Sequence, residues 1–197
     1  MHDEKPLTGE ESIAIITGMI NKAKQDYNET GVSCLLWGSI VTICNLATFI
    51  GIEFNAGWLG YVWYLIIVAI VGQVYISVRE SKRRVFKTYQ DAAMDGIWIS
   101  YGIAICLFSF YSSKFPLQHA NAVYLIVYGI PTFATGIARK FRPMVAGGIA
   151  WWVLAIVCMY AQSPYTFIYG AVAAQLAWFI PGIILRSRYL KAKRGNV

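Results

Sequence analysis

The sequence predicts an all-α integral membrane protein, a six-helix transmembrane bundle preceded by a cytoplasmic amphipathic helix. Composition is the first reason, because 57% of the 197 residues are hydrophobic and only 14% are charged, which is too apolar for an ordinary water-soluble domain. The second reason is that six apolar runs approach the length of about 20 residues that a helix needs to cross a bilayer. The third is that lysines and arginines gather in the short segments between these runs.

Residues 1–30 are predicted to form a cytoplasmic N-terminal segment that carries the amphipathic helix. Thr8 and Glu11 have the spacing of a capping box, and the apolar residues that follow recur at helical spacing along one stripe. The stripe consists of Ile13, Ile16, Ile20, Ala23 and Tyr27. Three roles stay open for it: resting on the membrane surface, packing under the bundle, or receiving a partner.

The transmembrane domain is predicted to cover residues 31–185, and residues 186–197 form a basic cytoplasmic tail. The spans are placed at residues 31–52, 57–78, 96–112, 119–138, 143–161 and 165–185. A weak internal repeat, with Tyr64 and Arg79 matching Tyr124 and Arg139 sixty residues on, indicates three helical hairpins. The alternative is chance similarity, because apolar segments draw on a small alphabet of residues.

Basic residues predict the orientation of the bundle, since short cytoplasmic loops of membrane proteins carry the excess of lysine and arginine. With both termini in the cytoplasm, sixteen of the 17 lysines and arginines lie inside and only Lys114 lies outside. Topology and attraction to anionic headgroups account for the basic clusters. We therefore expect membrane lipids as partners and no nucleic acid.

No catalytic constellation is visible in the sequence. Asp, Glu, Lys and Arg are absent from the middle of all the predicted spans, and Glu53, Asp95 and His119 sit at span ends. There is no GxSxG elbow, phosphate loop or His-rich metal motif. The four cysteines lie in or beside apolar runs without metal-ligand spacing. We expect a protein that is not an enzyme and that has no catalytic residues, metal or cofactor.

Neutral polar residues offer the strongest candidate site within the spans. Thr42, Asn45, Gln73 and Gln175 are the candidates for lining a polar cavity. The alternative is close helix packing, because small and polar residues recur as a stripe along the first span and such stripes normally face other helices. The stripe contains Cys34, Gly38, Thr42, Asn45 and Thr48.

Two prolines mark candidate helix breaks. Pro131 and Pro181 lie inside the fourth and sixth predicted spans, where each frees a carbonyl and bends the helix. Thr132 follows the first of them and, with Thr135, can cover the freed groups. Broken helices can build a solute site, although kinks without a site are the alternative. Trp151, Trp152 and Trp178 are expected to fill the bundle core.

Several turn and packing motifs recur along the chain, from Tyr128-Gly129-Ile130-Pro131-Thr132-Phe133 to Lys140-Phe141-Arg142-Pro143, and then Gly147-Gly148 and Trp178-Phe179-Ile180-Pro181-Gly182. These segments resemble those of a family of small bacterial polytopic membrane proteins that has no assigned activity. The resemblance extends over nearly the whole chain. It implies a bacterial cytoplasmic (inner) membrane and supplies no substrate.

The expected function is that of a non-enzymatic, multi-pass membrane protein that acts as a sensor or scaffold. Its basic loops and amphipathic helix would face lipids, a cytoplasmic protein partner or a second copy in a homo-oligomer. The alternative is a carrier or channel for a small neutral solute, which requires a continuous polar path.

Overall fold

The computed structural model describes residues 8–9, 12–13, 30–82 and 89–195, and their regular structure is entirely helical. Two short irregular helices interrupt the α-helices: η1 is a 3-10 helix and η2 is a π-helical turn. In chain order the elements are α2 (Val32–Glu53), η1 (Gly57–Tyr64), α3 (Leu65–Ser81), α4 (Tyr89–Lys114), α5 (Ala120–Ala138), α6 (Arg142–Tyr160), α7 (Tyr165–Ala174), η2 (Gln175–Phe179) and α8 (Ile180–Gly195).

Six helical segments are long and apolar enough to cross a membrane, which confirms the number of spans predicted from sequence. They are Val32–Glu53, Gly57–Ser81, Asp91–Lys114, Ala120–Ala138, Arg142–Tyr160 and Tyr165–Arg194. The third and last are longer than predicted. Hydropathy ends a span at the first polar residues, whereas backbone hydrogen bonding carries the helix on through Asp91 and Asp95 at one end of α4 and through the basic residues of α8.

Most of the predicted N-terminal amphipathic helix lies outside the described residues, including Glu11, Ile16, Ile20, Ala23 and Tyr27. The continuous described structure begins at Thr30, whose hydroxyl donates to a carboxylate oxygen of Glu80 on α3. This contact joins the start of α2 to the end of α3.

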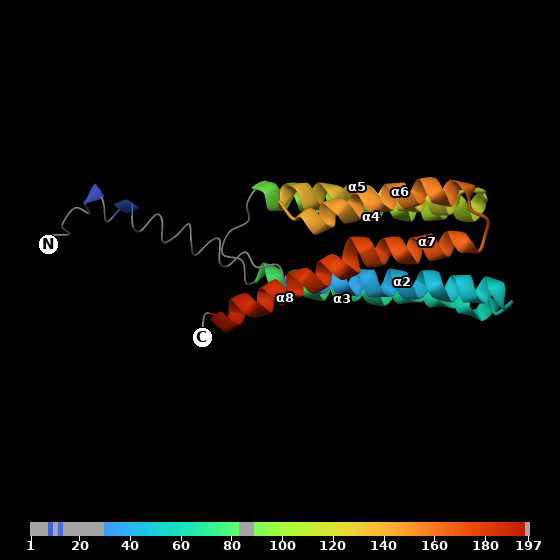
Figure 1. The fold of residues 1–197 in the computed structure, drawn as a ribbon, viewed down its shortest axis with the longest axis horizontal. Coiled ribbons are helices and arrows are strands. Elements are labelled where there is room, and N and C mark those ends of the chain that lie inside the picture. Colours follow the sequence, from blue (N-terminus) through green and yellow to red (C-terminus); the bar gives the residue numbers. More distant parts are fainter. Residues whose placement is uncertain (1–7, 10–11, 14–29, 83–88, 196–197) are drawn as a thin grey trace.

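The helices form two layers (Figure 1). One layer contains α4, α5 and α6, with α5 and α6 packed along their length, and the other contains α2, α3, α7 and α8. The layers meet where α6 contacts α7 and η2. Of the three hairpins suggested by the repeat, the third is divided between the layers, because α6 lies in one and α7 in the other.

Glycines allow the helices to approach closely at two of these contacts. A Cβ at Gly147 of α6 would collide with the backbone of Ala177 in η2, across the two layers. A Cβ at Gly38 of α2 would lie 2.7 Å from the backbone nitrogen of Phe179. Small residues therefore set the helix separation here, as is common where membrane helices pack.

Large apolar side chains cover the outward faces of α3 and α4. Val68 and Val71 of α3 are 62% and 65% exposed, and Leu107 of α4 is 64% exposed. These two spans bury almost none of their side chains against the rest of the bundle. Contiguous apolar surface of this kind is costly in water and favourable in lipid, so the surface fits a multi-pass membrane protein.

Candidate functional site

A cavity of about 410 Å³ lies between the two helix layers, in the half of the bundle that contains the α2–η1, α4–α5 and α6–α7 connections. One wall comes from α2, η1, α3 and α7, and the other from α4, α5 and α6. The aromatic lining residues are Trp63, Tyr124, Tyr128, Trp151 and Phe167. The other lining residues are Asn45, Thr48, Ile66, Ile105, Ser109, Asn121, Leu125 and Gly170.

Neutral hydrogen-bonding groups lie among the aromatic rings of the cavity. The amide Nδ2 of Asn45 donates to the Val41 carbonyl at 2.8 Å, and that of Asn121 donates to Thr166 Oγ1 at 2.7 Å. Trp63 Nε1 donates to Thr48 Oγ1 at 2.8 Å. None of the described lining residues is Asp, Glu, Lys, Arg or His. The cavity therefore suits an uncharged molecule, because it offers an ion no opposite charge.

Gly170 is the reason that Asn45 can reach the cavity. A Cβ at this position of α7 would lie 2.6 Å from Asn45 Oδ1. A residue with a Cβ would have to displace the Asn45 amide, whose side chain is buried between α2 and α7. The glycine thus places a polar group on the wall of an otherwise largely apolar space.

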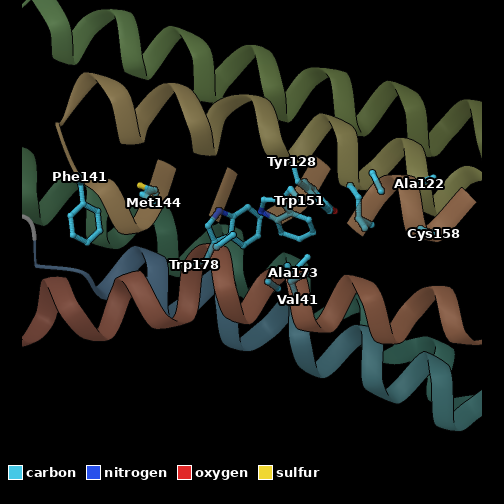
Figure 2. Close-up of a cluster of buried hydrophobic side chains, with 13 residues drawn as sticks. Val41, Ala122, Tyr128, Phe141, Met144, Trp151, Cys158, Ala173 and Trp178 are labelled. Atoms are coloured by element: carbon cyan, nitrogen blue, oxygen red, sulfur yellow. The ribbon is translucent and has the colours of Figure 1, made fainter. Parts of the chain in front are cut away.

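An aromatic layer closes the cavity on the side toward the C-terminal end of α8. We define this layer as Trp98, Tyr101, Tyr128, Trp151 and Trp178. The Tyr128 ring centroid lies 5.0 Å from that of Trp151 and 5.6 Å from that of Trp178, and the two indoles lie 5.3 Å apart. Figure 2 shows these three rings side by side between the helix layers. Their tilted and edge-on geometries are favourable for aromatic pairs.

Trp151 combines complete burial with an unsatisfied donor. The side chain has 0% exposure, and its indole Nε1 has no hydrogen-bond partner in the described part of the chain. Buried polar groups of folded proteins are nearly always paired, and indole N–H can act only as a donor. Trp151 therefore carries an indole N–H that is sealed within the bundle and unpaired among the described residues.

The structure does not bring the four residues predicted to share a polar cavity together around one space. Asn45 lines the cavity described above. Gln175 Nε2 donates to Thr42 Oγ1 at 2.9 Å, which joins η2 to α2. Gln73 accepts from Trp37 Nε1 at 3.1 Å and donates to Ser77. Thr42, Gln175 and Gln73 thus serve as contacts within one layer, because their helical faces point to neighbouring helices.

The helix-break positions organise the aromatic layer. Thr132 Oγ1 donates to the Tyr128 carbonyl and accepts from Trp178 Nε1, at 2.8 and 2.9 Å. Thr135 Oγ1 donates to the Pro131 carbonyl and accepts from Trp98 Nε1, at 2.7 and 3.0 Å. Each hydroxyl has a single hydrogen to donate. The expectation that these threonines cover the carbonyl freed by Pro131, that of Val127, is therefore wrong; they anchor two indoles instead.

Pro181 lies two residues after the π-helical turn η2. The wider turn shifts the backbone bonding, so that the Ile180 N–H bonds to the Gln175 carbonyl. A π-helical turn accommodates a proline ring that would clash with the carbonyl four residues before it. Trp178 lies within this turn, so the π-helical turn places one indole of the aromatic layer.

Sequence reasoning missed most of the aromatic lining. It assigned Trp151 and Trp178 to the core, where both are buried. Trp152 is only half-buried and packs on Phe133 instead. Tyr124, Tyr128 and Asn121 all lie on one face of the fourth span at helical spacing. That spacing was the available signal for the site.

No group of three or more His, Cys, Asp or Glu residues that could hold a metal ion occurs in the described ranges. The four cysteines are free; Cys44 and Cys158 are buried, whereas Cys106 is exposed. The residues that line the cavity can bind a solute through hydrogen bonds and ring contacts.

These features define an all-helical bundle with six spans of membrane-crossing length and an aromatic, uncharged internal cavity. Comparison of the chain with protein-family models, with curated proteins and with solved structures finds no match. The cavity and its surroundings are therefore the basis on which a function can be argued.

Proposed function

We propose that the chain is a non-enzymatic sensor in a bacterial cytoplasmic membrane, with both termini in the cytoplasm, and that its cavity binds a small uncharged solute. The observation that carries the proposal is the one-sided closure of the cavity. Asn45 and the aromatic rings line it in one half of the bundle, while the hydrogen-bonded aromatic layer separates it from the other half. A closed site of this kind can report occupancy without passing the solute on.

Packing contacts on the side of the aromatic layer away from the cavity support this proposal over a permanently open channel. Met144 and Phe141 are buried in the same core, on the side of Trp178 away from the cavity (Figure 2). Close to these residues in the chain, Gly147 of α6 lies in close contact with the backbone of Ala177 in η2. A solute path would have to separate these packed surfaces and break the two Trp–Thr hydrogen bonds.

Output to the cell would run through the cytoplasmic end of α8. This segment carries Arg186, Arg188, Lys191, Lys193 and Arg194, and follows η2 without a break in the helix. Trp178 in η2 contacts Trp151 of the cavity wall. A change in the cavity can therefore move a basic helix that suits anionic lipids or an acidic surface of a cytoplasmic protein partner.

Flux through proteoliposomes tests the sensor against its alternative, a carrier or channel for neutral solutes. Vesicles containing the full chain are shifted into glycerol or urea, and re-swelling is followed by light scattering. We expect the parent protein to re-swell no faster than protein-free vesicles. Trp178→Ala removes the indole from the aromatic layer but leaves the contact of Gly147 with Ala177, so it should stay as closed as Trp58→Ala, the matched control at an exposed position. Vesicles permeabilised with a pore-forming peptide show that the assay detects an open path. Rapid re-swelling of the parent would replace the sensor with the carrier.

A further inference from the structure

The cavity between the layers is open on one side, and that side indicates from where its solute arrives. We propose that the cavity opens sideways to the hydrocarbon of the bilayer between α3 and α4, and that its solute is an uncharged, lipid-soluble molecule that enters there. This inference rests on the proposed function, which places the bundle in a membrane and gives the cavity a solute.

Contacts between neighbouring helices close the cavity around most of its circumference. The Tyr124 hydroxyl of α5 donates to Ser109 Oγ of α4 at 2.9 Å. Asn121 of α5 donates to Thr166 of α7 at 2.7 Å. On the other wall, α2 packs on α7 and on η1. Each of these pairs of helices is therefore joined beside the cavity.

The junction between α3 and α4 is different. Helix α3 packs on α2 and η1, whereas α4 packs on α5, and α3 and α4 share no extensive contact within the described ranges. At the level of the cavity, no hydrogen bond or ring contact between described residues joins α4 to α3 or η1. The wall is consequently incomplete between these two helices.

Burial of the lining side chains falls toward the same junction. Leu125 and Tyr128 of α5 are buried on the far wall. Ile66 of α3 and Ile105 of α4 are only half-buried, and Ser109 of α4 is exposed. The mouth of the cavity therefore lies between α3 and α4, and we define it by Ile66, Ile105 and Ser109.

The position of the mouth favours entry from lipid. Ile66 and Ile105 lie well inside the spans Gly57–Ser81 and Asp91–Lys114. The adjoining outward side chains of the two helices are also apolar and exposed, as at Ile67 and Ile103. At this depth a bilayer consists of hydrocarbon, so a molecule that reaches the mouth must be dissolved in lipid. Charged molecules and polyols are excluded because they lose their hydration there without compensation.

The interior of the cavity suits the same class of molecule. None of its described lining residues is charged, and most of the lining is aromatic or aliphatic. The amides of Asn45 and Asn121 contain both donors and an acceptor, so they can serve a small neutral group of either kind on the solute. The volume of about 410 Å³ lies within the range of pockets that enclose small organic ligands.

Photolabelling of the full chain in proteoliposomes tests the lateral entry. The probe is iodophenyl trifluoromethyl diazirine, an uncharged molecule that dissolves in bilayer hydrocarbon. Light expels dinitrogen from it, and the resulting carbene inserts into a neighbouring C–H, N–H or O–H bond. We expect label on outward residues such as Val68 and Leu107, and also on the buried wall at Leu125 and Tyr128, mapped by mass spectrometry. Label confined to outward residues would overturn the proposal.

Excess 2-methylnaphthalene separates binding in the cavity from contact with bulk lipid. A bounded cavity can be filled by this competitor, whereas the bilayer around the helices is not saturated. Label at Leu125 and Tyr128 should therefore fall, while label at Val68 and Leu107 should stay as it was. Label that falls to the same extent at both sets of residues would contradict a bounded site.

Three variants assign the route. Ser109→Trp and Ile105→Trp add bulk at the mouth and should lower the label on Leu125 and Tyr128 about fivefold or more. Ile103→Trp, at an outward position of the same helix, is the matched control and should keep the parental pattern. Since Ser109 is exposed, its variant does not depend on repacking of the core.

The outcomes separate this inference from the proposed function. Label on the cavity wall that survives in both mouth variants would overturn entry between α3 and α4. A failure of the sensor proposal shows itself instead as glycerol or urea flux in the parent protein, a measurement that does not involve the photolabel.

Discussion

At the scale of single residues, tryptophans join the two layers of the bundle. Trp151 of α6 is wholly buried between Tyr128 and Trp178, and Trp178 of η2 donates to Thr132 of α5 across the layers. Trp98 of α4 donates to Thr135 of α5 within one layer. In lipid, apolar surface gains little by leaving the solvent, so association of helices depends on packing and on hydrogen bonds between helices. Large rings with one polar edge supply both.

Replacing Trp151 by Ala should destabilise the protein by about 3–5 kcal/mol, the range for an aromatic side chain removed from a packed core. The cost comes from the unfilled space between the layers. Unfolding of the detergent-solubilised protein by increasing mole fractions of SDS measures it. Trp58→Ala, at a side chain that is 69% exposed, should change the free energy of unfolding by less than about 0.5 kcal/mol. Equal effects of the two substitutions would contradict the assigned core.

Thr132→Val should cost about 0.5–2 kcal/mol, because it keeps the side-chain shape but leaves the Trp178 indole without its acceptor. The same unfolding measurement applies, and intrinsic fluorescence should shift as the environment of Trp178 changes. Ser113→Ala is the control, since its hydroxyl is exposed and bonds to the Phe110 carbonyl of its own helix. A loss for Ser113→Ala as large as that for Thr132→Val would show that the Trp178 contact contributes nothing of its own.

At the scale of helices, glycines and the π-helical turn decide where the layers touch. Gly147 admits the backbone of Ala177, and Gly170 admits the Asn45 amide. The turn η2 then rotates the chain between α7 and α8, so that Ala177 and Trp178 face α6. We call these contacts, which run from Gly170 beside the cavity to Ala177 and Trp178 before the start of α8, the contact line.

A glycine pair tests this contact line. Gly147→Ala should destabilise the protein, because its Cβ would overlap the Ala177 backbone and force α6 and η2 apart, at a cost of about 1–3 kcal/mol. Gly102→Ala in α4 meets no atom within 4 Å, so it should be neutral or stabilise by up to about 1 kcal/mol through higher helix propensity. SDS unfolding of both variants gives the comparison. If Gly147→Ala proves as stable as Gly102→Ala, α6 and η2 are not in close contact.

At the scale of the whole molecule, the proposed orientation in the membrane rests on the distribution of charge. At one end of the bundle, Lys114 is the one lysine or arginine in or beside the connections between helices. Lys140, Arg142 and the basic residues of α8 lie at the other end. The positive-inside rule then favours the second end for the cytoplasm. With this orientation, the half of the bundle that the aromatic layer separates from the cavity faces the cytoplasm.

Reporter fusions test the orientation. Fusions after residues 54, 115 and 163 should be active outside the cytoplasm, because these positions follow the first, third and fifth spans. A fusion after residue 140 should be active in the cytoplasm and is the control for the same set of reporters. Cytoplasmic activity of the first three would mean that the bundle is inverted.

The sequence by itself determined the class of the fold, the number of spans and their approximate limits. These depend on local properties, since a segment crosses a bilayer when it is long and apolar enough and pairs its own backbone groups. Pro131 and Pro181 were singled out as candidate helix breaks, because a missing N–H is a property of the residue alone; in the structure α5 continues through Pro131, whereas the π-helical turn η2 precedes Pro181. Even the error at α4, whose helix extends back to Tyr89, arose only from ending the span where hydropathy falls.

Only the tertiary structure decided which polar and aromatic residues meet. Asn45 and Gln73 were grouped by polarity, yet one lines the cavity and the other bonds to Trp37, because the faces of their helices turn to different neighbours. Trp151 and Asn45 lie more than a hundred residues apart in the chain and share a wall. Such pairs depend on how six helices are rotated and spaced against one another. That arrangement is a property of the packed bundle, to which every helix contributes, and no single segment encodes it.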